Sequence, residues 1–332
     1  MFEEIVAAFM VAALILYALM GGADYGGGCW DLLARGPRAT RQRRAIARAI
    51  GPIWEANHVW LILVVVLLFT GFPRGFAIIM TALNIPLTLM LIGIVLRGSA
   101  FAFRKYDRRD EPVQRRWSVL FGGASFLTPL IQGMTLGALA TGQIRAGSTG
   151  LTTGFLAGWL SPFAWSCGVF ALSLFAFLAA TYLTVDTEKE PDLQEDFRAR
   201  ALWSGLLLGP IAAVVFLVSR EGAPAMFEGL TRWWAPYLLG ATILLGLGAI
   251  VALWQRRYRW ARMAAIGEVS LILGGWSLAQ YPHLIVPDIT LQASRAPDAT
   301  LRLLTIALCL GAVLLLPSLY FLFHIFKGEE SR

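Results

Sequence analysis

Two stretches of this chain place ionisable side chains inside long apolar runs. Asp24 lies among glycines in the run GGADYGGG at residues 21–28. Glu55 and His58 lie three residues apart in the run PIWEANHVWL at residues 52–61, a spacing that brings them to one face of a helix. Carboxylates and imidazoles can pass protons to one another directly or through water. Because ionisable groups at membrane depth are costly unless they are paired, hydrated or neutral, the sequence predicts a proton pathway through Asp24, Glu55 and His58.

A structural role for the same residues stays open at this stage. Asp24 and Glu55 could instead pair or hydrogen-bond between packed helices, with Arg97 at the inner end of the third predicted span as their partner. Arg97 itself has two interpretations, as a countercharge or as a side chain that snorkels to the interface. Glu268, in the eighth predicted span, has no partner that the sequence identifies.

Metal and haem sites within this chain are not predicted. Glu55 and His58 have the spacing of a di-iron half-site, but a complete site needs that motif on two helices and the chain has it once. The histidines His58, His283 and His324 fall at different predicted depths, which does not suit paired axial haem ligands. Cysteines at positions 29, 167 and 309 lack a CxxC spacing. We therefore expect no cofactor bound by this chain alone.

The elements that carry these residues are predicted to be membrane-spanning helices. The chain has 332 residues, of which 57% are hydrophobic and 15% charged, and a mean hydropathy of +0.65. Apolar runs long enough to cross a hydrocarbon core of about 30 Å recur along its whole length. About nine spans are expected, at residues 5–28, 50–70, 76–98, 118–140, 154–184, 203–219, 235–254, 262–281 and 301–325.

The basic residues fall mainly in alternate connections, at 35–48, 104–116, 189–200 and 256–262 and at the C-terminus. By the positive-inside rule this predicts a cytoplasmic C-terminus and an external N-terminus. The net charge of +7 therefore reflects topology and membrane lipid, and no nucleic acid partner is expected. The polar segment 186–200 is expected to be a solvated linker, and no segment is long enough to form a water-soluble domain.

Four motifs together resemble subunit II of the cytochrome bd family of quinol:dioxygen oxidoreductases. They are the two runs above, LRG at 96–98 and GGWSLAQYP at 274–282. The resemblance covers the whole chain. It implies an all-α integral membrane protein with two four-helix bundles, 1–140 and 154–281, and a ninth peripheral helix at 301–325.

The resemblance also implies a function. Subunit I would carry haems b558, b595 and d and the main quinol site, and it would reduce dioxygen to water in the bacterial inner membrane. Subunit II would stabilise the complex and contribute to the proton supply through the carboxylates that correspond to Asp24 and Glu55. A structural quinone in this chain and a small single-helix accessory subunit stay open. Three positions depart from some members of the family: Gly21 and Glu55 stand in place of aspartates, and His58 in place of glutamine.

A second class of function remains open from the sequence. Intramembrane carboxylates and helices interrupted by glycines are also typical of proton-coupled secondary transporters and channels. An internal repeat would favour a transporter, but residues 1–140 and 154–281 show no clear sequence repeat.

Overall fold

The protein is a bundle of long helices with short strands at one end. The computed structural model describes residues 1–51, 54–106, 111–147 and 150–328. Pro52 and Ile53 of the second motif, Arg108 and Arg109 of the third connection, and Arg332 lie outside the described residues. The elements are α1 Phe2–Leu32, α2 Ala39–Ile50, α3 Trp54–Gly71, α4 Pro73–Ala82, α5 Asn84–Tyr106, α6 Glu111–Ala140, β1 Ala146–Gly147, β2 Gly150–Leu151, α7 Pro162–Asp186, α8 Pro191–Gly222, α9 Pro224–Leu230, α10 Ala235–Trp254, α11 Tyr258–Gln280, β3 His283–Ile285, β4 Ile289–Thr290, α12 Leu291–Ser294 and α13 Asp298–Gly328.

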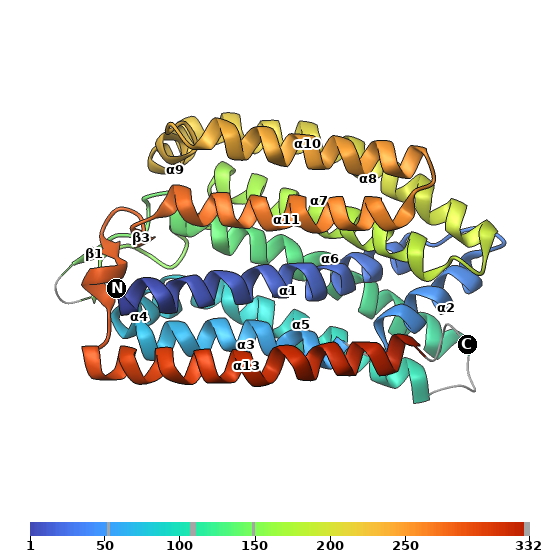
Figure 1. Cartoon of the computed structure of the whole chain (residues 1–332), viewed down its shortest axis with the longest axis horizontal. Helices are drawn as coiled ribbons and strands as arrows, with labels where there is room; N and C mark the ends of the chain where they lie inside the picture. The colour runs from blue at the N-terminus through green and yellow to red at the C-terminus, as the bar shows by residue number, and fades with distance from the viewer. Residues whose placement is uncertain (52–53, 107–110, 148–149, 329–332) are drawn as a thin grey trace.

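The all-α membrane class is confirmed. Within the described residues, eight helices are long and apolar enough to cross a membrane, namely α1, α3, α5, α6, α7, α8, α10 and α13. The eighth predicted span corresponds to α11, which has 23 residues but carries Glu268 and two arginines and is not among the eight. It nevertheless runs along the bundle beside α10 (Figure 1).

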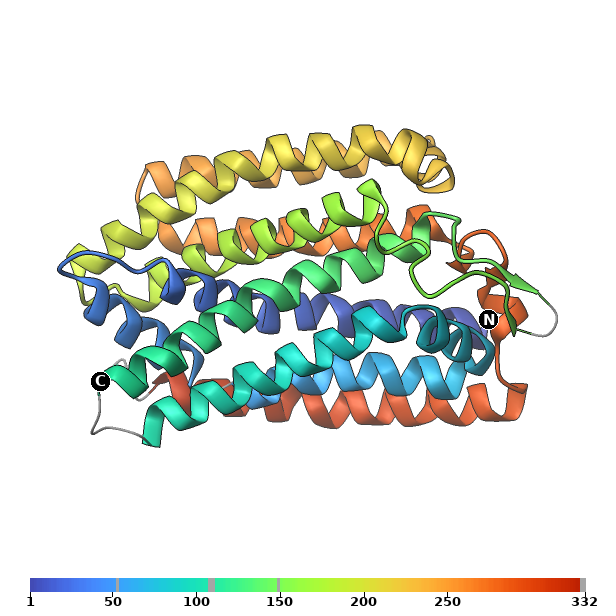
Figure 2. The same ribbon diagram turned by 180° about the vertical axis from the view of Figure 1, so that it is seen from behind.

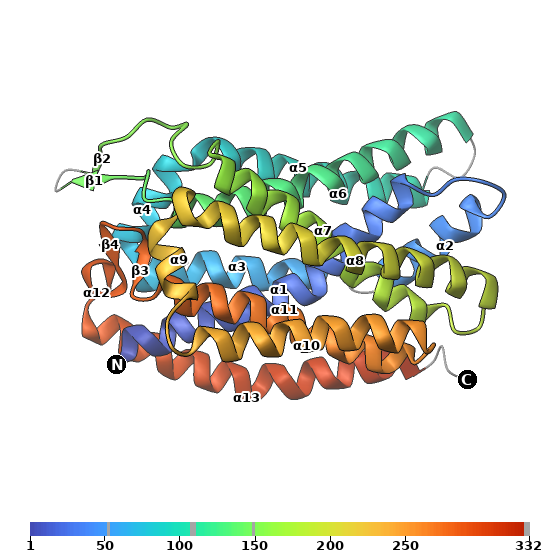
Figure 3. The ribbon, with the colours of Figure 1, turned by 90° about the horizontal axis from the view of Figure 1, so that it is seen from above.

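The termini of the described chain support an odd number of crossings. α1 begins at the end of the molecule that holds the strands and α12, whereas α13 ends at the opposite end of the bundle, the end at which α2 also lies (Figure 3). A chain that starts at one end and finishes at the other crosses the long axis an odd number of times. With α11 included, the long helices make that number nine.

Two predicted helix boundaries were wrong, because helices begin and end at prolines and capping residues that the hydropathy of an apolar run does not detect. The third span, expected at 76–98, is the separate helix α4 followed by α5, which begins at Asn84. The fifth, expected from residue 154, begins at Pro162. There the Ser161 side chain accepts a hydrogen bond from the Ala164 amide at 3.1 Å, which caps the helix with proline in its first turn.

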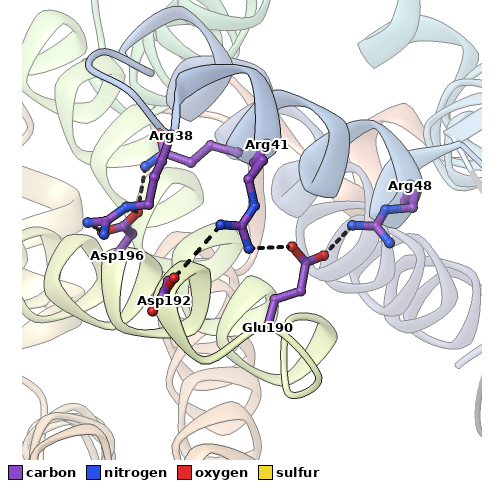
Figure 4. A network of polar contacts seen from close by, with 7 residues as sticks. Arg38, Arg41, Arg48, Glu190, Asp192 and Asp196 are labelled. Carbon is purple, nitrogen blue, oxygen red and sulfur yellow. Dashed lines mark hydrogen bonds and ion pairs between the residues drawn. The ribbon is translucent and has the colours of Figure 1, made fainter.

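In the expected linker at 186–200, only residues 187–190 lie outside helices, because α7 ends at Asp186 and α8 begins at Pro191. Three acidic residues of this segment pair with arginines on or next to α2, which lies in the first connection (Figure 4). We call this set the α2–α8 ion-pair cluster; it comprises Arg38, Arg41, Arg48, Glu190, Asp192 and Asp196. Arg38 donates two hydrogen bonds to Asp196, of 2.6 and 2.9 Å. Hydrogen bonds from Arg48 and Arg41 hold the pKa of the Glu190 carboxyl below its ordinary value.

α1 and α7 form the centre of the bundle. α1 packs on α3, α6 and α7, while α7 also packs on α6, α8 and α11. α6 lies between α5 and α7, as the view from behind shows (Figure 2). The glycines of α1 permit this close packing, as the sequence indicated: a Cβ added at Gly26 would collide with the carbonyl oxygen of Phe175 on α7.

Candidate functional site

Asp24 is buried at the centre of the first four long helices. Asp24 is 4% exposed, and its carboxylate accepts a hydrogen bond from the side-chain amide of Asn57 on α3. Asn57 is fully buried, and its own carbonyl oxygen has no hydrogen-bond partner among the described residues. The sequence signal for Asn57 is weak: it is an amide that lies between Glu55 and His58 in an apolar run. Asp24 is therefore hydrogen-bonded to Asn57, the residue that precedes His58.

Arg97 lies in the same region and does not snorkel. It belongs to α5 and is 1% exposed, and its guanidinium carbon lies 4.8 Å from the centre of the Tyr25 ring and 5.3 Å from that of Phe121. Its Nε and one terminal nitrogen have no hydrogen-bond partner within the described part of the chain. Its charge acts electrostatically on Asp24 without a direct ion pair between the two described side chains. Cation–π contacts therefore hold the arginine inside the protein.

His58 extends the buried polar region toward α6. Its ring centre lies 6.2 Å from that of Tyr17 and 6.3 Å from that of Tyr25, both on α1. Tyr17 donates to the Tyr25 hydroxyl at 3.3 Å and accepts from Gln132 at 2.7 Å. The Nδ1 atom of His58 is buried without a partner among the described residues. Tyr17 and Gln132 could not be predicted from the sequence, because tyrosine and glutamine in apolar runs carry no spacing signal.

Glu55 is placed differently from the other predicted residues. Its side chain is exposed at the start of α3. Among the described residues, no hydrogen bond or ion pair joins it to Asp24 or His58. The structure therefore brings together Asp24, His58 and Arg97, and leaves Glu55 on the outside of the chain.

α1 carries a second buried carboxylate, Asp31, which was not predicted as a site residue. Asp31 is 1% exposed, and its Oδ1 lies 2.9 Å from a terminal nitrogen of Arg104 on α5. The Nε of Arg43 on α2 donates to the Asp31 carbonyl at 3.3 Å and lies 4.0 Å from its Oδ2. The sequence does contain a signal for this pair. Asp31 follows Asp24 by seven residues and Arg104 follows Arg97 by seven, a spacing that places each pair on one face of its helix.

Glu268 lies apart from these groups, on α11. It is 9% exposed, and its Oε1 would be 2.8 Å from a Cβ added at Gly246 on α10. Its Oε2 is buried with no hydrogen-bond partner in the described part of the chain. A glycine on α10 therefore makes the room that this carboxyl group occupies.

Haem or metal ligands do not converge in the part of the chain that the structure describes. No group of three or more His, Cys, Asp or Glu side chains there is arranged to hold a metal ion. His58 lies on α3 beside α1, while His283 lies in β3 at the strand-bearing end of the molecule (Figure 1). These two histidines do not fit a shared haem.

Comparison with known proteins gives one consistent family. The model of the family "Cytochrome bd terminal oxidase subunit II" matches residues 2–326. The putative cytochrome bd menaquinol oxidase subunit II of Bacillus subtilis is 22% identical over 96% of this chain and 93% of its own length. The cytochrome bd-I ubiquinol oxidase subunit 2 of Escherichia coli K12 is 30% identical over 62% of this chain and 52% of its own.

A solved structure has the same fold. A chain in the structure of the bd oxidase from Geobacillus thermodenitrificans matches with a TM-score of 0.76 and 22% identity, over 98% of both chains. At that level of identity the match establishes the fold of this chain.

Proposed function

Because this chain belongs to the cytochrome bd terminal oxidase subunit II family, we propose that it supports quinol oxidation and dioxygen reduction by a haem-bearing subunit I. In this proposal it stabilises the complex and supplies protons from the cytoplasmic side. The family match favours this function over a proton-coupled transporter or channel.

The observation that carries the proposal is the buried group around Asp24. A carboxylate, an amide and an arginine lie together inside an otherwise apolar bundle, with Asp24 bound to Asn57 and Arg97 nearby. Ionisable residues at membrane depth are rare and mark ion or proton routes. Arg97 supplies positive charge near Asp24, so the carboxyl group is not left as an uncompensated buried charge when it loses its proton.

The other predicted residues take distinct places in this route. His58 would accept or pass a proton beside Tyr17 and Tyr25. Glu55, exposed on α3, would act where this chain meets water or its partner subunit. Electron transfer would take place on haems b558, b595 and d in subunit I. Quinol and dioxygen are the substrates of that subunit, and a structural quinone or a small accessory subunit would be additional components.

The location follows from the charge pattern. Arginines gather at the α2 end of the bundle, including Arg38, Arg41 and Arg48. We assign that end to the cytoplasm and the strand-bearing end to the outside of the bacterial inner membrane. Reporters near Arg43 and Arg257 should then read as cytoplasmic, and reporters near Arg145 and Arg295 as external.

The test is the variant Asp24→Asn in the complex that the chain forms with its partner subunit. The amide keeps the size of the side chain but cannot release a proton in turnover, so oxygen consumption should fall about a hundredfold while haem content persists. Asp288→Asn is the matched control, because Asp288 is an aspartate paired to Arg145 at 2.9 Å at the other end of the bundle. Normal oxygen consumption by a fully assembled Asp24→Asn complex would refute the proton-supply role.

A further inference from the structure

Buried polar atoms without partners are concentrated in one part of the molecule. Eleven buried side-chain nitrogen and oxygen atoms have no hydrogen-bond partner among the described residues. Seven of them lie on α1, α3, α5 and α6: Asp31 Oδ2, Asn57 Oδ1, His58 Nδ1, Arg97 Nε and Nη2, Ser125 Oγ and Gln132 Oε1. Since nearly all buried polar groups in native proteins are hydrogen-bonded, this concentration indicates bound water.

Two levels of the bundle each carry a carboxylate of α1 and an arginine of α5. Asp24 and Asp31 share a face of α1, seven residues apart, and Arg97 and Arg104 share a face of α5 with the same spacing. Seven residues correspond to about 10 Å along a helix. α1 and α5 both run from the strand-bearing end toward the α2 end (Figure 1). Each carboxylate on α1 therefore has an arginine of α5 at its own level, and the Asp31 level is nearer the α2 end.

Ser125 on α6 lies between the two levels. It is fully buried, and its hydroxyl faces Gly28 of α1 so closely that a Cβ at Gly28 would collide with it. The Cys29 thiol donates to the Ser125 carbonyl at 3.3 Å, so the backbone of α6 is held here while the hydroxyl is left without a partner. Gly28 and Ser125 thus leave a polar atom at the midpoint between Asp31 and Asp24.

The Asp31 level reaches the protein surface. The side chains of Arg104 and Arg43, which flank Asp31, are 17% and 36% exposed, whereas that of Asp31 is 1% exposed. One oxygen of the buried Asp31 carboxylate is bound to the partly exposed Arg104, and the other lies 4.0 Å from Arg43 without a hydrogen bond among the described residues. That second oxygen can accept a hydrogen bond from water that enters from the α2 end.

We propose that Asp31, held by Arg104, is the cytoplasmic mouth of the proton path, and that Ser125 connects it to Asp24 through ordered water. This inference rests on the proposed function, because it gives the path an entrance. Asp31 is a positioning residue: it orients the first water and keeps Arg104 at the mouth. Ser125 supplies a hydroxyl that can donate to one water and accept from the next.

The experiment compares two path variants with two matched controls in the assembled complex. Asp31→Asn removes the charge at the mouth, and its control is Asp288→Asn, which breaks an Asp–Arg pair of the same length, 2.9 Å, at the opposite end. Ser125→Ala removes the hydroxyl and adds no atom at the close contact with Gly28. Its control is Thr128→Val, one turn further along α6, where the hydroxyl is already satisfied by the Ala124 carbonyl at 2.7 Å.

Both path variants should lower oxygen consumption about tenfold with haem content unchanged, and both should enlarge the slowing of turnover in heavy water, because proton delivery then limits the rate. Asp31→Glu should restore most of the rate. The controls should behave as the unaltered complex. If Asp31→Asn does not assemble, Ser125→Ala decides the question, since it leaves every ion pair in place.

The outcomes separate the inference from the proposed function. If Asp24→Asn is slow but Asp31→Asn and Ser125→Ala match their controls in rate and isotope effect, the path does not enter through Asp31, and the inference is overturned. If Asp24→Asn is also normal, the proton-supply role itself falls, and the inference falls with it.

Discussion

Asp24 and Glu268 are both buried carboxylates on long helices, but their surroundings differ. Asp24 receives a hydrogen bond from Asn57 and lies in the field of Arg97, and α1, α3, α5 and α6 all contribute polar atoms nearby. Glu268 lies against Gly246 of α10, and its Oε2 has no partner among the described residues. One region is a polar core shared by four helices, while the other holds a single acidic group in a glycine recess. A connected polar core can conduct protons, whereas an isolated group can only store one.

The largest expected difference is in turnover. Asp24→Asn should slow oxygen consumption about a hundredfold, while Glu268→Gln should stay within about twofold of the unaltered complex. The amide at position 268 keeps the shape of a group to which no other described side chain is bonded. Oxygen consumption and haem content of both purified complexes measure this. Equal losses in the two variants would mean that the isolated carboxyl group is also part of the route.

The second difference concerns the glycines of the two regions. A Cβ at Gly26 would collide with the Phe175 backbone, which cannot move without separating α1 from α7, whereas a Cβ at Gly246 would meet the flexible end of Glu268 at 2.8 Å. Gly26→Ala should therefore destabilise the complex by about 2 kcal/mol or more, and Gly246→Ala should cost much less. Thermal denaturation of the complex is the measurement. Equal melting temperatures of the two variants would show that the close contact between Gly26 and the Phe175 backbone does not limit stability.

A third test separates Glu55 from Asp24. Glu55 is exposed and bonded to neither Asp24 nor His58 within the described residues. Glu55→Gln should therefore reduce turnover by about tenfold, less than Asp24→Asn, and Glu55→Asp should keep partial activity because the acid remains. The three variant complexes are compared by their oxygen consumption at matched haem content. A loss as large as that of Asp24→Asn would show that every proton passes Glu55.

The smallest expected effect is at the α2–α8 ion-pair cluster. The pKa of Glu190 is lowered by hydrogen bonds from Arg48 and Arg41, so its stabilisation is fully present above the ordinary carboxylate range and is lost as the pH falls through the lowered value. Glu190→Gln should cost about 1 kcal/mol or less at neutral pH, because these pairs are partly exposed. The difference in melting temperature between Glu190→Gln and the unaltered complex should shrink as the pH falls below the ordinary glutamate pKa of about 4.3, and disappear once the pH is below the lowered pKa of Glu190. A difference that persists in acid would assign the effect to packing.

The sequence predicted the membrane fold and Asp24 because both leave local signals. Long apolar runs identify spans, and a carboxylate between glycines is conspicuous in such a run. Asn57, Asp31 and Arg104 were missed because their partners come from other helices. The helical character of 191–200 was missed for the same reason, since its acidic side chains pair with arginines about 150 positions earlier in the chain.

Glu55 shows the limit of spacing arguments. Three residues advance a helix by 300°, so residues three apart are about 60° apart around the axis. His58 turns toward Tyr17 and Tyr25 of α1, and that offset leaves Glu55 exposed. Only the packing of α3 on α1 decides which of two neighbouring side chains faces inward.

The α2–α8 ion-pair cluster also has a consequence for the order of events during synthesis. Arg38, Arg41 and Arg48 emerge from the ribosome long before Glu190 and Asp196, their eventual partners. During that interval the arginines are unneutralised, which is when their charge can hold the first hairpin in its orientation as it enters the membrane. Once α8 has been made, the same charges are covered by carboxylates. The arginines that orient the nascent chain therefore also form the ion pairs that hold α2 against α8 in the folded protein.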